Sequence, residues 1–196
     1  TCTRKVLCTL AETNTAHEFV NVDLTKGEHK SPAHMARQPF GQVPAIDDDG
    51  FGLYESRAIC RYINETRGGN LMPTDAKGRA VAEQWMSAEA SNFTPVAMKL
   101  IYQFVFHPMM GKPTDDAKVA EATTQLDAMM PIFEAHLGKH LYFAGEAFSL
   151  ADVCYLPYVE YLMPTAAKST FAKYPSFMAW WNRCSERASW RKAAGR

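Results

Sequence analysis

The sequence predicts an α+β domain over residues 1–68, followed by an all-helical domain over residues 79–196. Strand-like segments mix with helical ones in the first third of the chain, where Asp48-Asp49-Gly50 is a strong β-hairpin signal. The later segments have apolar residues almost entirely at helical spacing. Residues 69–78, which include the loop-like stretch NLMPTDAK, are typical of a linker.

The first domain is expected to alternate helices and strands. Ser31-Pro32 is typical of a helix start, with serine as N-cap and proline at the first helical position, and Ser56 caps a later helix in the same way. The expected elements are, in order, a helix over 1–13, a strand over 18–24, a short helix from 31, strands over 43–47 and 51–55, and a helix over 56–66.

The first helix has no strand before it. A βαβ unit needs a leading strand that packs under the helix and pairs in parallel with the strand at residues 18–24. We therefore expect about ten further residues ahead of Thr1, and a fold in which this leading strand is missing from the sequence.

The second domain is expected to contain four main helices. A long helix over 79–109 contains Pro95, and a second one over 114–137 contains Pro131; each proline predicts a kink. Ser149 and Asp152 form a capping box ahead of an apolar helix that ends near residue 163. The last main helix starts at residues 173–176.

The composition excludes several classes of protein. Lys+Arg and Asp+Glu are both 21, and this balance argues against a nucleic-acid partner. No apolar stretch reaches the ~18 residues of a membrane-spanning helix, and no signal peptide is visible. The five cysteines form neither a CxxC pair nor a metal-ligand cluster. We expect a cytoplasmic protein without a metal or a membrane partner.

Gln42-Val43-Pro44 is the first candidate binding element. A proline at a strand start cannot donate to the ladder, and a cis bond before it would leave the backbone N–H and C=O of Val43 free. A free backbone pair beside a sheet can bind an extended peptide. The alternative is an ordinary trans proline, which is the commoner state of an X–Pro bond.

Glu55-Ser56-Arg57 lies where a strand meets a helix. The helix start offers free N–H groups to a carboxylate, Ser56 can donate a hydrogen bond to it, and Glu55 can pair with an ammonium group. The motif therefore fits the α-amino-acid end of a ligand. The alternative is a plain N-cap beside a solvated glutamate.

Two cationic or polar segments complete the set. His29-Lys30 precedes a short helix and could neutralise a second carboxylate, or could be a solvated loop. Thr1 and Cys2 open the first helix, where a hydroxyl and the helix dipole would favour a bound thiolate. The alternative for this segment is a capped surface helix.

Taken in order, TCTRKVLCTLAE, RQPFGQVPAI, LYESRAI and FAGEAFSLADVCYLPY resemble the glutathione transferases, most closely the phi class, over almost the whole chain. The resemblance implies a thioredoxin-like first domain and a co-substrate role for glutathione. Val43 would precede a cis proline and bind the cysteinyl backbone of glutathione. Glu55 and Ser56, with Arg57 beside them, would hold the γ-glutamyl end; the glycine carboxylate would be held by His29, Lys30 and Gln42.

The resemblance also implies a catalytic serine directly before the position of Thr1, so Thr1 or Cys2 would carry its role if no such serine exists. The electrophile would be a small apolar molecule held by the first long helix of the second domain, and the chain would form a homodimer. The expected wall of that pocket is Phe93, Met98, Ile101, Tyr102 and Phe106, and about half of such residues are expected in the core instead.

Three functions remain open from the sequence. The first is conjugation of the glutathione thiolate to apolar electrophiles. The second is a glutathione-dependent thiol transferase or dehydroascorbate reductase that uses Cys2 as nucleophile. The third is a non-catalytic carrier of apolar ligands.

Overall fold

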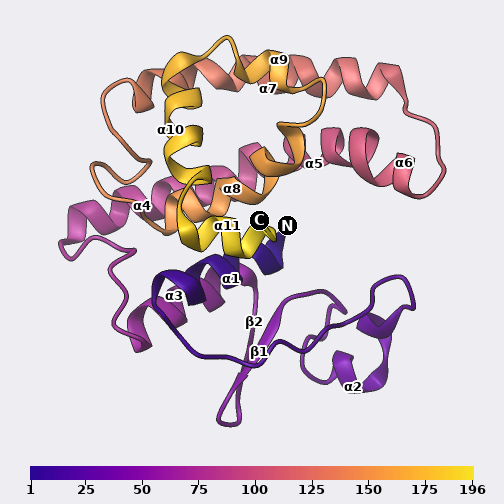
Figure 1. Cartoon of the computed structure of the whole chain (residues 1–196), viewed down its shortest axis with the longest axis vertical. Helices are drawn as coiled ribbons and strands as arrows, with labels where there is room; N and C mark the ends of the chain where they lie inside the picture. Colours follow the sequence, from indigo (N-terminus) through magenta and orange to yellow (C-terminus); the bar gives the residue numbers. More distant parts are fainter. The chain divides into compact units, whose positions relative to one another are not determined.

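The computed structural model describes the whole chain, residues 1–196. It contains two compact units: unit 1 comprises Thr1–Asn70 and Ala188–Arg196, and unit 2 comprises Leu71–Arg187 (Figure 1). The predicted fold class is confirmed, because a small α+β unit is followed by a helical one. The division after residue 70 falls inside the predicted linker, but the last helix groups with unit 1 and not with the helical unit.

Unit 1 is built around one antiparallel hairpin. Helix α3 contacts both strands and α1, and α11 packs on α1. The elements of unit 1 are α1 (Cys2–Glu12), the 3-10 helix η1 (Glu28–Lys30), α2 (Pro32–Met35), β1 (Ala45–Asp48), β2 (Phe51–Tyr54), α3 (Ser56–Thr66) and α11 (Ala188–Ala194).

The hairpin forms as predicted at Asp48-Asp49-Gly50. Asp49 and Gly50 adopt positive φ angles of 53° and 90°, which a tight turn between twisted strands requires. The Gly50 N–H donates to the Asp47 carboxylate at 2.9 Å and fixes the turn. Ala45 pairs with Tyr54 and Asp48 with Phe51.

The predicted strand over residues 18–24 is not part of the sheet, so this prediction was wrong. The sheet consists of β1 and β2 alone. Residues 16–22 follow α1 without regular structure and make no backbone hydrogen bond. The sequence has the apolar and β-branched composition of a strand, but a strand also needs a partner edge. Phe19 and Val20 are therefore exposed.

Helix α11 completes the core of unit 1. Its Trp190 is fully buried. Its Ser189 donates a hydrogen bond to the carboxylate of Glu12 and accepts one from the Cys8 thiol, with both partners on α1. The end of the chain thus stabilises the first helix, a contact that the sequence did not predict.

Unit 2 is entirely helical. The predicted long helix over 79–109 is a run of α4 (Ala76–Ala88), the π-helical turn η2 (Glu89–Phe93), α5 (Thr94–Ile101), the π-helical turn η3 (Tyr102–Phe106) and α6 (His107–Met109). Pro95 lies in the first turn of α5, directly after η2. A proline lacks the N–H of a regular helix, and a π turn is one way to accommodate the lost hydrogen bond.

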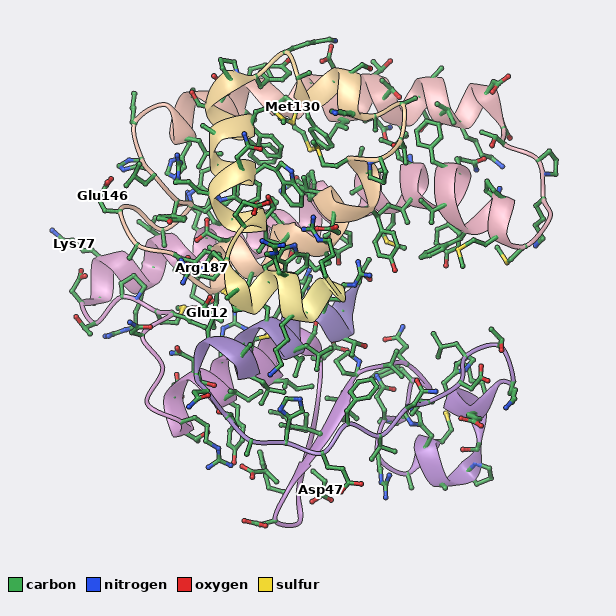
Figure 2. All side chains as sticks on the ribbon, viewed as in Figure 1. Glu12, Asp47, Lys77, Met130, Glu146 and Arg187 are labelled. Atoms are coloured by element: carbon green, nitrogen blue, oxygen red, sulfur yellow. The ribbon has the colours of Figure 1, made fainter.

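Four more helices complete unit 2: α7 (Asp116–Leu137), α8 (Leu150–Leu162), α9 (Lys168–Phe171) and α10 (Pro175–Ser185). Helix α8 is buried along most of its length. Met130 of α7, labelled in Figure 2, is fully buried in the core of this unit. The aromatic part of the core includes Trp85, Phe93, Phe133, Phe143, Tyr155 and Trp180. None of the helices combines the length and apolarity needed to cross a membrane.

Candidate glutathione site

The two peptide-binding motifs predicted from the sequence meet at one end of the hairpin. Ala45 pairs with Tyr54 at this end of the hairpin. Pro44 directly precedes Ala45, and Glu55 directly follows Tyr54, so the two motifs flank the same end of the paired strands. The two motifs lie 11 residues apart in the chain at their nearest, from Pro44 to Glu55, and the strand pairing brings them to the same end of the hairpin.

Val43 offers an unpaired backbone. The Val43–Pro44 peptide bond is cis, as the family resemblance implied and contrary to the commoner trans state. Neither the N–H nor the C=O of Val43 forms a hydrogen bond within the chain. Val43 is only half-buried, so both groups can pair with the backbone of a bound extended peptide.

Glu55 and Ser56 form the start of α3. Glu55 adopts φ 70° and ψ 107°, which is unusual for a residue with a side chain and is the kind of strain that gathers at functional sites. No side chain caps this helix, so its first N–H groups remain available. The Ser56 side chain is buried at this end, whereas Glu55 is exposed. Arg57 follows in the same turn.

The loop before Val43 is tied to η1 and α2. Lys30 Nζ donates to the Phe40 carbonyl at 3.0 Å, and His34 Nε2 lies 2.7 Å from the Gln42 carbonyl. The Gln42 N–H donates to the buried side chain of Gln38. These bonds hold Gln42 beside the motif. His34 was not among the site residues predicted from the sequence, although its position just after the Ser31-Pro32 helix start was a signal.

Gly41 is required at the centre of that loop. Its φ is 60°, and a Cβ atom there would lie 2.7 Å from the Lys30 side chain and 2.8 Å from the sulfur of Met35. Glycine therefore permits both the turn and the close approach of Lys30. Of the two predicted cations, Lys30 already binds a carbonyl, while His29 Nδ1 is buried without a partner.

The start of α1 carries the candidate sulfur-activating groups. Thr1 is the N-cap, but its hydroxyl makes no capping bond and lies 3.9 Å from the Cys2 sulfur. Both side chains are half-buried. The other four cysteines are buried, and burial raises the pKa of the Cys60 thiol to about 11. Cys2 is thus the accessible thiol of the chain.

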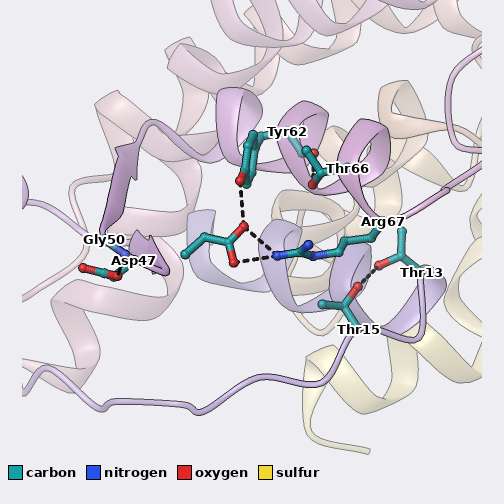
Figure 3. Close-up of polar contacts among 8 residues, drawn as sticks. Thr13, Thr15, Asp47, Gly50, Tyr62, Thr66 and Arg67 are labelled. Atoms are coloured by element: carbon teal, nitrogen blue, oxygen red, sulfur yellow. Dashed lines mark hydrogen bonds and ion pairs between the residues drawn. The ribbon is translucent and has the colours of Figure 1, made fainter.

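Unit 1 also contains a cavity of about 700 Å³. The Asp48 carboxylate lies at its wall, where it accepts hydrogen bonds from Tyr62 at 2.6 Å and from Arg67 at 2.5 and 2.6 Å (Figure 3). These bonds, with that of Tyr62 the largest influence, lower the pKa of Asp48. Val43 and Pro44 line the cavity; Glu55, Ser56, His29 and Lys30 do not. The cavity walls are formed by α1, residues 15–24, β1 and α3.

The predicted electrophile residues divide into two groups. Phe93 and Ile101 are fully buried in the core of unit 2, where Phe93 packs against Phe133 and Tyr155. Met98 and Phe106 are half-buried, and Tyr102 is 47% exposed. An exposed electrophile wall on unit 2 can therefore include Met98, Tyr102 and Phe106. It cannot include Phe93 and Ile101.

Comparison with known proteins identifies the family of both parts of the chain. Residues 2–65 match the family "Glutathione S-transferase, N-terminal domain", and residues 93–188 match "Glutathione S-transferase, C-terminal domain". Glutathione S-transferase F9 of Arabidopsis thaliana is 37% identical over 98% of this chain and 92% of its own length. A glutathione S-transferase of Hyoscyamus muticus is 40% identical over 96% and 91% of the two chains.

Solved structures give the same result. Glutathione transferase F7 from Populus trichocarpa superposes with a TM-score of 0.94 at 37% identity, over 99% of this chain and 93% of the other. Glutathione S-transferase I from maize, in complex with an atrazine–glutathione conjugate, gives a TM-score of 0.92 at 34% identity, over 98% and 91%. The relatives named above are plant phi-class enzymes. The chain therefore belongs to the glutathione S-transferase family.

Proposed function

We propose that unit 1 binds glutathione at the hairpin end formed by Val43, Pro44, Glu55 and Ser56, and presents its thiolate to an apolar electrophile. The observation that carries the proposal is the strand register, which brings an unpaired backbone and a helix start together. Glutathione carries complementary groups: a peptide backbone at its cysteine and an ammonium–carboxylate pair at its γ-glutamyl end.

Each end of the tripeptide has a partner of suitable chemistry. The γ-glutamyl carboxylate accepts hydrogen bonds from Ser56 and from the first N–H groups of α3, with Arg57 in the same turn, while Glu55 pairs with the ammonium group. Val43 pairs with the cysteinyl backbone. The glycine carboxylate forms an ion pair with Lys30 and accepts hydrogen bonds from His29 and Gln42. The unpartnered Nδ1 of His29 supports this assignment.

The thiolate is stabilised at the start of α1. A free thiol has a pKa of about 8.5, and lowering it by about two units requires roughly 2.7 kcal/mol of preference for the anion. A hydroxyl donor such as that of Thr1 contributes about 1.5–3 kcal/mol, and the helix dipole about 0.3–1 kcal/mol. The two together are sufficient. The thiolate sulfur then forms a bond to the electrophilic carbon, and the leaving group departs with its electron pair.

Residues of unit 2 bind the electrophile. Met98, Tyr102 and Phe106 offer an adaptable apolar wall, since Met and aromatic side chains accept varied shapes. The atrazine conjugate in the related maize enzyme supports an aromatic substrate for this chain as well.

Turnover with glutathione and 1-chloro-2,4-dinitrobenzene tests this function on the full chain. Ser56→Ala is expected to reduce kcat/KM by roughly 10- to 150-fold, because a hydrogen bond to a charged group contributes about 1.5–3 kcal/mol. Glu65→Ala, an exposed carboxylate near the other end of α3, is the matched control and should leave kcat/KM unchanged. Absence of turnover and of glutathione binding in the unaltered chain would refute the proposal.

Cys2 supports a second candidate activity, thiol–disulfide exchange, because it is the accessible thiol and lies at a helix start. Cys2→Ser separates the two activities. Conjugation should persist in this variant, whereas exchange with a glutathione mixed disulfide should disappear.

The site of action and the quaternary state belong to the same proposal. We infer a cytoplasmic homodimer, as the family resemblance implies. Light scattering at micromolar concentration should give twice the mass of one chain, and a monomer would contradict the inference.

A further inference from the structure

The π-helical turn η3 changes which side chains share a face at the end of α5. Within η3 the His107 N–H donates to the Tyr102 carbonyl, five residues back. In a regular α-helix, residues five apart point about 140° away from each other. Here the rings of Tyr102 and His107 lie 6.3 Å apart in an edge-to-face arrangement. The π turn therefore brings His107 to the aromatic face, which the sequence pattern alone does not show.

Three rings and one imidazole make up this face, which we call the aromatic cluster: Tyr102, Phe106, His107 and Tyr161. Tyr102 and Phe106 lie 5.2 Å apart, and Phe106 and Tyr161 5.8 Å apart, both edge to face. Tyr161 comes from α8. No member is fully buried. The cluster is thus a partly exposed aromatic surface within unit 2, with one nitrogen-bearing ring in it.

The imidazole of His107 has an unused polar atom. Its Nδ1 is buried and has no hydrogen-bond partner. A buried polar atom without a partner costs about 1–3 kcal/mol, and an acceptor on a ligand would remove this cost. Tyr102, whose ring lies beside the imidazole, is 47% exposed.

We propose that His107 is a specificity-determining residue that selects flat aromatic electrophiles carrying a hydrogen-bond acceptor, such as a nitro or carbonyl oxygen. The aromatic ring of the electrophile packs on Tyr102 and Phe106, and Nδ1–H of His107 donates to the acceptor. This inference rests on the proposed conjugating function, and it adds the substrate class to it.

The test compares two electrophiles in the full chain. 1-Chloro-2,4-dinitrobenzene carries acceptor oxygens, and benzyl chloride has an aromatic ring without them. His107→Phe keeps a ring and removes the nitrogen, so kcat/KM should decrease roughly 2- to 12-fold for the dinitro compound, the value of one neutral hydrogen bond. For benzyl chloride it should stay within about twofold, since no such bond exists to lose.

Two further variants separate this role from a structural one. His107→Asn places an amide N–H near the position of Nδ1 and should restore most of the activity with the dinitro compound. His140→Phe replaces an exposed histidine elsewhere in unit 2 and should leave kcat/KM unchanged for both electrophiles. Equal losses for both electrophiles, or no loss for the dinitro compound, would overturn the inference.

Binding of unreactive 1,3-dinitrobenzene, measured by calorimetry, distinguishes the two proposals. If the unaltered chain binds it in a manner that depends on His107 but conjugates nothing, the binding role stands and the conjugating function fails. If the chain conjugates both electrophiles and His107→Phe binds 1,3-dinitrobenzene as well as the unaltered chain does, the conjugating function stands and the role of His107 fails.

Discussion

Asp152 is a buried carboxyl group whose hydrogen bonds join several segments of unit 2. Its Oδ1 accepts hydrogen bonds from the Phe143 N–H at 3.0 Å and from Trp180 Nε1 at 2.8 Å. Its Oδ2 accepts from the N–H and the hydroxyl of Ser149 at 2.8 and 2.9 Å, which forms the capping box predicted from the sequence. Burial raises the pKa of Asp152, and the four donated bonds oppose that rise.

Asp152→Ala would leave these donors without an acceptor in the core. Each orphaned buried donor costs about 1–3 kcal/mol, so we expect the free energy of unfolding to decrease by about 3 kcal/mol or more in urea titrations. Asp116→Ala, at an exposed first-turn aspartate of α7, should cost within about 1 kcal/mol. Equal effects of the two substitutions would show that the buried network contributes no more than a surface carboxylate.

At the scale of elements, α7 ends in a pH-sensitive contact. His136 in its last turn lies 3.0 Å through Nε2 from the Phe143 carbonyl, with its ring 4.5 Å from that of Trp85. Desolvation, followed by the neighbouring His140, lowers the pKa of His136 below its ordinary value of 6.5. The fold therefore favours the neutral imidazole, which donates from Nε2 and keeps its place among the rings.

The sign of the pH effect follows from this direction. Just below pH 6.5, His136 is protonated in the unfolded chain but stays largely neutral in the folded chain. The free energy of unfolding therefore falls as the pH decreases through 6.5. Urea unfolding at pH 7.5 and 5.5 should show this loss, and His136→Gln, which cannot be protonated, should reduce it. His140→Gln, at an exposed position, should reduce this loss of stability less than His136→Gln does. A pH dependence that is identical in the unaltered chain and in His136→Gln would contradict the assignment.

Local sequence signals predicted some elements well and others poorly. The Asp48-Asp49-Gly50 turn, the Ser31-Pro32 helix start and the Ser149 capping box each depend on residues within a few positions of one another, and all three are present. The strand expected at 18–24 failed because pairing depends on a second segment. The π turn η3 directly precedes the helix turn that contains Pro108, as η2 precedes the one with Pro95, but the place of His107 beside the ring of Tyr102 was not predicted from the sequence.

The candidate site likewise has features that local sequence predicted and features that depend on the fold. The sequence identified Val43, Glu55 and Ser56 as separate weak signals, each with a plausible alternative. The structure adds the register that brings them to one hairpin end and the strained backbone of Glu55. It also removes Phe93 and Ile101 from the expected electrophile wall, because helical spacing does not tell which side of a long helix faces the core.

At the scale of the whole molecule, the chain forms two compact units, and its last residues, Ala188–Arg196, belong to the first unit. After the nine helical elements of unit 2, α11 belongs to unit 1, where the buried Trp190 and the bonds of Ser189 hold it to α1. The helix whose first residues are proposed to stabilise the thiolate is therefore supported by the last residues of the chain.

The central claim is that the Val43–Ser56 end of the hairpin recognises glutathione through its γ-glutamyl group. Calorimetric binding of glutathione and of cysteinylglycine, which lacks that group, tests it most directly when measured for the full chain and for Ser56→Ala. We predict that Ser56→Ala weakens glutathione binding roughly 10- to 150-fold and leaves the weaker binding of cysteinylglycine unchanged. An equal loss for both ligands, or none for glutathione, would contradict the account.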